Sequence, residues 1–265
     1  MKKLVRAFNL YALVPLLLAG FCVGYVWRDS RQHEKDKALF AAINANATPA
    51  VIAALKHGAE PNARDMPEDT RTLKERFLDL IHFSHRTELR REQHETALRI
   101  AVNREDANAP LVKALLDAGA DPNAIVIYSS PHGNGLSDHA PSALLLAEYT
   151  RNYSISHWLV ERHADLHPQS EMGDSSLIIA ASYGNRAEVE YLLEHGANIE
   201  DEDAWSNCAL TCAADNDDTA ALKCLIEHGA NVNHKDRYGI TALKTAHDTK
   251  HPAAEKMLLR AGAVQ

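Results

Sequence analysis

The chain has 265 residues, of which 46% are hydrophobic and 24% charged, a composition typical of a folded protein. Its formal net charge of −8 is unevenly distributed, because residues 1–31 carry +4 and the remainder therefore carries −12. A domain this acidic would repel phosphate groups, which excludes nucleic acid as an expected partner.

The N-terminus reads as a membrane address. A basic tip, residues 1–9, precedes an apolar run of 18 residues, Leu10–Trp27, which is just long enough to cross a bilayer as a helix. We therefore expect residues 10–27 to be an uncleaved transmembrane signal-anchor, followed by a linker over 28–35. The alternative is a cleaved signal peptide, but the run contains its small-x-small cleavage site only in weak form.

The charges around this run also suggest an orientation. Positively charged segments tend to stay on the cytoplasmic side, so the basic tip favours a cytoplasmic N-terminus. Basic residues on the far side, such as Arg28 and Arg31, weaken that asymmetry. We expect a single-pass protein of a bacterial inner membrane, with the rest of the chain in the periplasm.

A short sequence pattern recurs every 33 residues. His195-Gly196-Ala197-Asn198 lies 33 residues before His228-Gly229-Ala230-Asn231, and Gly262-Ala263 comes another 33 later. Including the upstream copies at Gly58, Gly119 and His163, the pattern occurs six times. Each copy follows an apolar segment, and glycine there ends a helix because it adopts the left-handed backbone without steric cost. His163 replaces that glycine once, which should cost stability or bend the structure.

Another apolar segment stands ahead of each copy, directly after a residue such as Ser or Thr that can cap a helix. Thr96–Ala101 and Thr241–Ala246 are two such segments. Two helices closed by Gly-Ala-x-x-Asn at a 33-residue period resemble the ankyrin repeat. Both segments keep the Thr, Leu and Ala of the family's Thr-Pro-Leu-His-x-Ala signature, although no repeat keeps both the Pro and the His.

The resemblance implies an all-α solenoid of about six helix-turn-helix repeats over residues 36–265, with the last repeat as a C-terminal cap. The period fails twice, which indicates insertions over 66–91 and 125–138. The first reads as an added amphipathic helix and the second as a protruding loop. The predicted repeats span about 36–65, 92–124, 139–168, 172–202, 205–235 and 238–263.

Residues with catalytic or metal-binding chemistry do not form a recognisable site. His82, His85 and His94 lie near one another, but a third or fourth ligand at a zinc-site spacing is missing. His132, Ser137 and Asp138 lack the turn that positions a nucleophile. We therefore predict that the chain is not an enzyme and binds no metal, cofactor or small-molecule substrate.

Three cysteines outside the apolar run fall in the fifth predicted repeat. Cys212 and Cys224 align with core positions of its two helices, so in an oxidising periplasm they can form a disulfide that leaves Cys208 free. The alternative, which the sequence favours, is that all three are buried thiols that pack as small hydrophobic groups.

The strongest functional signal is a concentration of acidic residues. Between Asp165 and Asp218 stand 13 acidic residues against one basic residue, Arg186. Such a surface suits a basic protein partner, with aromatic residues on successive inter-repeat loops as anchors, although solubility alone also favours acidic surfaces. The predicted partner-binding residues are Asp201, Glu202, Asp203, Trp205, Asp215, Asp217, Asp218, Arg237 and Tyr238.

Two functions fit these features. The first is a membrane-tethered module that captures a probable basic protein in the periplasm and inhibits it, as an immunity protein neutralises a toxin. The second is an adaptor or scaffold for an envelope or redox enzyme. The resemblance to ankyrin repeats implies protein binding in either case and does not identify the partner.

Overall fold

The computed structural model describes residues 31–64, 96–104, 107–124, 141–167, 170 and 172–264. Within these ranges the chain is helical, and extended pairing is limited to two isolated bridges, Arg64–Thr96 and Lys235–Thr241. The predicted all-α class is confirmed for this part of the chain. None of its helices is both long and apolar enough to cross a membrane. The predicted anchor, 10–27, and the predicted insertions, 66–91 and 125–138, lie outside the described residues.

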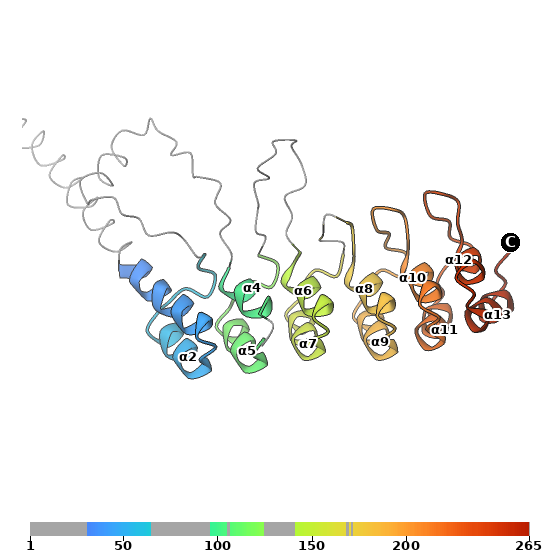
Figure 1. Cartoon of the computed structure of the whole chain (residues 1–265). Helices are drawn as coiled ribbons and strands as arrows, with labels where there is room; N and C mark the ends of the chain where they lie inside the picture. The colour runs from blue at the N-terminus through green and yellow to red at the C-terminus, as the bar shows by residue number, and fades with distance from the viewer. Residues whose placement is uncertain are drawn as a thin grey trace, which may run out of the picture.

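The described helices form six consecutive pairs that stack side by side (Figure 1). Each pair falls where one of the six repeats was predicted. The pairs are residues 31–44 with α2 (Thr48–Lys56), α4 (Ala97–Val102) with α5 (Ala109–Asp117), α6 (Ala143–Tyr149) with α7 (Tyr153–Glu161), α8 (Ser176–Ser182) with α9 (Arg186–Glu194), α10 (Ala209–Asp215) with α11 (Thr219–Glu227), and α12 (Ala242–Asp248) with α13 (Pro252–Arg260).

The first helix starts earlier than the sequence suggested. Residues 31–35 are helical, although they were assigned to a linker. Gln32 explains their order, because its Nε2 donates both to Asp36 Oδ1 (2.9 Å) and, across the pair, to the carbonyl oxygen of Gly58 (3.0 Å). These contacts fix the start of the helix against the end of its partner.

Helix starts follow the predicted capping chemistry. An oxygen-bearing side chain at the N-cap accepts a hydrogen bond from the N–H three residues on, which satisfies one of the free donors of the first turn. Cys208 is the exception, since its thiol makes no capping bond for α10. The hydroxyl caps of the other first helices from α4 onward are Thr96, Ser142, Ser175 and Thr241.

Helix ends follow the predicted glycine pattern. The five glycines of the repeated motif have φ between 88° and 95°, the left-handed region that glycine tolerates. His163 adopts the same region, with φ of 63°, at the end of α7. The prediction that His163 takes the place of a glycine is confirmed, and a side chain in this conformation carries a steric cost.

The core runs without interruption along the stack. Paired alanines on the first helices, such as Ala180 with Ala181 and Ala213 with Ala214, are fully buried, which lets α8 and α10 approach closely. The second helices pack in the same order, with one weak junction: α7 and α9 pack less closely than any other consecutive pair of described second helices. The stack therefore has a distinct junction between its third and fourth repeats.

Candidate protein-binding surface

Two loops between repeats share one construction and place an aromatic residue at the surface. We call residues 200–207, before α10, the first finger, and residues 233–240, before α12, the second finger; both project to the same side of the stack (Figure 1). In the first finger, Asp203 Oδ1 accepts from the N–H groups of Trp205 and Asn207, both at 2.8 Å. Asp236 does the same in the second finger, accepting from the N–H groups of Tyr238 (2.8 Å) and Ile240 (2.7 Å).

These turns present the predicted aromatic anchors. Trp205 is 38% exposed and Tyr238 is 70% exposed, so both offer apolar area to a partner. The fingers also contact each other, because the N–H of Arg237 donates to the carbonyl oxygen of Trp205 (3.1 Å). Trp205, Arg237 and Tyr238 therefore lie on two joined loops, as the sequence predicted only for their order along the chain.

The predicted acidic residues divide into two groups. The first group is occupied within the protein. Asp201 is only 8% exposed and accepts from Asn198 Nδ2 (2.8 Å), so it does not offer the free carboxylate that the sequence prediction required. Asp203 builds the finger turn, and Asp218 caps α11 by accepting from the N–H groups of Ala220 (2.9 Å) and Ala221 (2.8 Å).

The second group faces solvent. The Glu202 side chain is 45% exposed, and its nearest cationic neighbour is His234, whose Nε2 lies 3.8 Å from Glu202 Oε1. Asp215 is the exposed last residue of α10, and Asp217 is exposed in the turn that follows. Glu202, Asp215 and Asp217 are thus the carboxylates of the predicted set that a partner can reach.

Sequence reasoning missed further exposed side chains next to the fingers. Tyr149 ends α6, and its hydroxyl donates to Asp174 Oδ2 (2.6 Å) just before α8. Tyr183 follows α8, with the guanidinium of Arg151 lying 4.2 Å from its ring centroid. Both tyrosines and Met172 are more than a third exposed. Their repeat positions are occupied by other residue types elsewhere, so the 33-residue period did not single them out.

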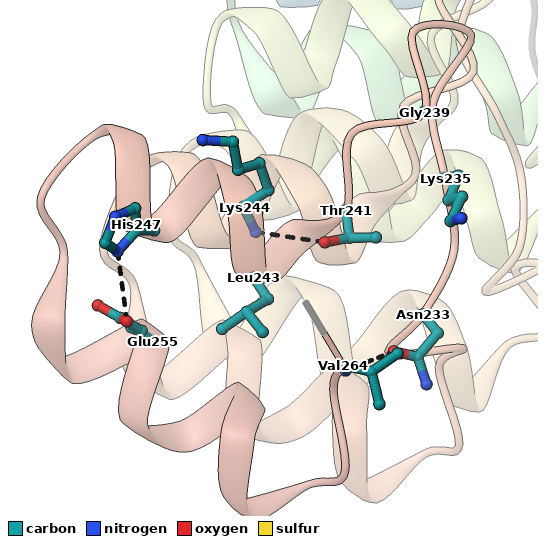
Figure 2. A pocket seen from close by; sticks show the side chains of 9 residues that line it. All are labelled: Asn233, Lys235, Gly239, Thr241, Leu243, Lys244, His247, Glu255 and Val264. Carbon is teal, nitrogen blue, oxygen red and sulfur yellow. Dashed lines mark hydrogen bonds and ion pairs between the residues drawn. The ribbon is translucent and has the colours of Figure 1, made fainter.

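A cleft of about 500 Å³ opens on the last repeat (Figure 2). The second finger forms one wall, α12 and α13 form another, and Leu243 contributes an apolar side chain. His247 Nδ1 and Glu255 Oε1 lie 3.4 Å apart at its rim. Because Lys235 and Lys244 also line this cleft, it does not share the acidic character of the surface around Glu202 and Asp215.

The cysteines of the fifth repeat are free thiols. The alternative of a Cys212–Cys224 disulfide is therefore not present in this structure. Cys224 Sγ lies 3.7 Å from His228 Nδ1, on its own helix end. Burial raises the pKa of Cys212 to about 12, only partly offset by a hydrogen bond with Ser182 of the preceding repeat. The two thiols therefore face different neighbours, and the favoured prediction of unpaired thiols matches the structure.

Metal and catalytic candidates add nothing to this surface. In the part of the chain that the structure describes, no three His, Cys, Asp or Glu side chains gather closely enough to hold a metal ion. His82, His85, His94 and the segment from His132 to Asp138 lie outside the described residues.

Comparison with known families agrees with the helix pairs. A model of the single ankyrin repeat matches residues 93–125, and a model of three consecutive ankyrin repeats matches residues 143–236 and 177–264. No curated protein matches the chain. The matched segments cover more than half of the chain and coincide with the pairs from α4 to α13. The chain belongs to the ankyrin repeat family.

Proposed function

We propose that this chain is a membrane-tethered binding module whose two fingers hold a basic protein in the periplasm of a bacterium. Ankyrin repeats generally mediate protein–protein interaction, which supports the binding role. Residues 10–27 supply the tether, for which the apolar run and the basic tip of the sequence are the support. The proposal assigns no catalytic activity to the chain.

The observation that carries this proposal is the pairing of aromatic and acidic groups on one surface. Trp205 and Tyr238 are exposed on joined fingers, and Glu202 is exposed beside Trp205. Aromatic residues contribute strongly to binding because they bury a large area at small entropic cost. Exposed carboxylates attract a basic partner during encounter and disfavour acidic proteins.

Within this function, the chain acts as an inhibitor or immunity protein that captures one toxin-like partner. A single tether and an acidic surface suit stoichiometric capture. The second candidate is an adaptor for an envelope or redox enzyme, and the basic cleft between the second finger and α12 favours it, because a second surface of different charge suits a second partner. Affinity capture with the full chain in detergent, followed by mass spectrometry, separates the two: one tightly bound basic protein supports the inhibitor, and several weakly bound proteins support the adaptor.

Binding kinetics with the captured protein then test the surface. The triple variant Glu202→Gln, Asp215→Asn and Asp217→Asn should lower the association rate about tenfold at low salt and flatten its salt dependence. Asparagine tolerates the left-handed backbone of Asp217, whose φ is 53°, so the turn is retained. Lys244→Gln, in the basic cleft, is the matched control and should leave the association rate unchanged. An unaltered rate in the triple variant contradicts the proposed surface.

A further inference from the structure

The junction between the third and fourth repeats contains two buried carboxyl groups. Glu148, in α6, is fully buried, and Glu188, in α9, is 2% exposed. The hydroxyl of the fully buried Ser156, in α7, lies between them, in contact with Glu148 Oε1 and 2.9 Å from Glu188 Oε1. On the solvent side, His157 Nε2 lies 2.8 Å from Glu188 Oε2. We call Glu148, Ser156, Glu188 and His157 the junction cluster.

Hydrogen-bond counting shows that the junction cluster holds a proton on a carboxyl group. A serine hydroxyl has one hydrogen and can donate to only one of the two carboxyl oxygens that it contacts. The other contact is a hydrogen bond only when the carboxyl itself carries a proton and donates. Glu148 Oε2 is also buried, and no N–H or O–H donor of the described residues reaches it. Glu148 is therefore the group that carries the proton, while Glu188 faces the imidazole of His157.

This cluster stands where the regular contacts between repeats are weakest. α7 and α9 pack less closely than the other consecutive second helices of the described stack. Elsewhere an asparagine of the repeated motif binds the backbone of the next repeat, as Asn62 does with Gly119, but His167 occupies that place here. The contacts from α7 to α9 are made instead by His157, which pairs with Glu188 and stacks on Tyr191 at 3.8 Å between ring centroids.

We infer that this junction is a proton-controlled hinge: the third and fourth repeats stay locked while the junction cluster holds its proton, and open more readily once the proton is lost. Loss of the proton leaves two carboxylates facing each other in a buried site with one hydroxyl donor between them. Two like charges without solvent are unstable there, so the repeats relieve the repulsion by separating. The inference does not depend on the identity of the binding partner.

The charged groups around the cluster do not remove this effect. From α7, only His157 and Ser156 contact the carboxyl groups, and α8 contributes no ionisable side chain to the contact with α6. From α4, Arg99 donates to the carbonyl oxygen of Pro141 (2.6 Å). From α5, Lys113 lies over the Trp158 ring and Asp117 pairs with Arg162. From α9 itself, Arg186 pairs with Glu190, and α11 turns Cys224 toward His228.

The direction of the pH dependence follows from Glu148. Burial, and next the charge of Glu188, raise the pKa of the Glu148 carboxyl above its ordinary value of 4.5. The open junction releases this proton near the ordinary value, whereas the closed junction keeps it. The contribution of Glu148 to closure is therefore complete below about pH 4.5 and is progressively lost as the pH rises.

Amide hydrogen exchange of the full chain in detergent tests the hinge, measured from about pH 6 to about pH 9 and corrected for the intrinsic chemical rate. The opening equilibrium of α7 and α9 should increase by up to about tenfold per pH unit, with a smaller change in α11 and α13. Glu148→Gln keeps the shape of the side chain and removes the ionisable proton, so its opening should not depend on pH. Glu190→Gln, on the same helix as Glu188 but 45% exposed, should behave as the wild type.

Two outcomes overturn the inference: Glu148→Gln keeps the wild-type pH dependence, or all helices open equally as the pH rises. A measurement on the unaltered chain covers the case in which Glu148→Gln does not fold. Carboxyl-carbon NMR of the chain labelled at glutamate should show one glutamate that titrates far above the ordinary pKa range. If every glutamate titrates within that range, the hinge is excluded.

Discussion

The Asn123 side chain binds the residue that ends the following repeat's second helix. Its Nδ2 donates to the carbonyl oxygen of His163 (3.0 Å), while its Oδ1 accepts from the N–H of Asp165 (2.8 Å). Asn62 and Asn233 make the same pair of bonds to the repeats that follow them. The asparagine of the repeated motif is thus a clamp between repeats, a role that its position alone does not reveal.

Replacing this clamp should weaken the stack locally. Asn123→Ala removes both hydrogen bonds to the next repeat and is expected to lower the free energy of unfolding by about 1–2 kcal/mol. Urea denaturation of the full chain in detergent measures the change. Asn103→Ala, at an exposed residue after α4, is the control and should stay within about 0.5 kcal/mol of wild type. Equal effects from the two variants would show that the clamp carries no stability.

The residue that this clamp binds offers the opposite change. His163 has φ of 63°, where a side chain is strained, so His163→Gly should raise the free energy of unfolding by about 1 kcal/mol. Gly196→Ala, at the same place in the next repeat, should lower it by a similar amount. A Cβ at Gly196 would meet no atom within 4 Å, so this second change tests the backbone alone. Urea midpoints that move in the same direction for both variants would refute the argument.

Two neighbouring carboxylates in the first finger should respond differently. Asp203→Ala removes three acceptor contacts that hold the finger, including the one with Asn207 Nδ2 (3.0 Å), and should cost about 1–2 kcal/mol. Glu202→Ala removes an exposed side chain and should cost less than about 0.5 kcal/mol. Thermal or urea denaturation distinguishes them. The assignment of Asp203 to the turn fails if the two variants are equally stable.

The thiols of the fifth repeat should all be available once the chain is denatured. Without reductant, alkylation of the unfolded chain is expected to label Cys208, Cys212 and Cys224, as peptide mass spectrometry will report. In the folded chain near pH 8, Cys212 should react slowly, because burial raises its pKa to about 12 and few thiolates form. Labelling of Cys212 and Cys224 only after reduction would reveal the disulfide that the structure lacks.

Much of the fold could be predicted because it depends on local rules repeated at one period. A residue such as Thr241 caps a helix through its own hydroxyl, and Gly229 ends one through its own backbone freedom. These properties belong to single residues and are visible in the sequence. His163 was identified for the same reason, since the period showed that a glycine was missing.

The binding surface and the hinge depend on tertiary structure and could be predicted only in part. Asp201, Glu202 and Asp203 are consecutive in sequence, yet one is buried, one is exposed and one builds a turn. Glu148 and Glu188 are 40 residues apart and meet only when their repeats stack. The sequence therefore indicated an acidic region, but not which carboxylates remain free for a partner.

The loose contact between α7 and α9 also decides how the protein loses its structure. In a stack of repeats, each unit is stabilised only by the units beside it, so cooperative unfolding extends no further than the weakest interface. The described part of the chain should accordingly denature as two blocks, one ending with α7 and the other starting with α8. Both fingers belong to the second block, so this block can retain its recognition surface after the first has melted.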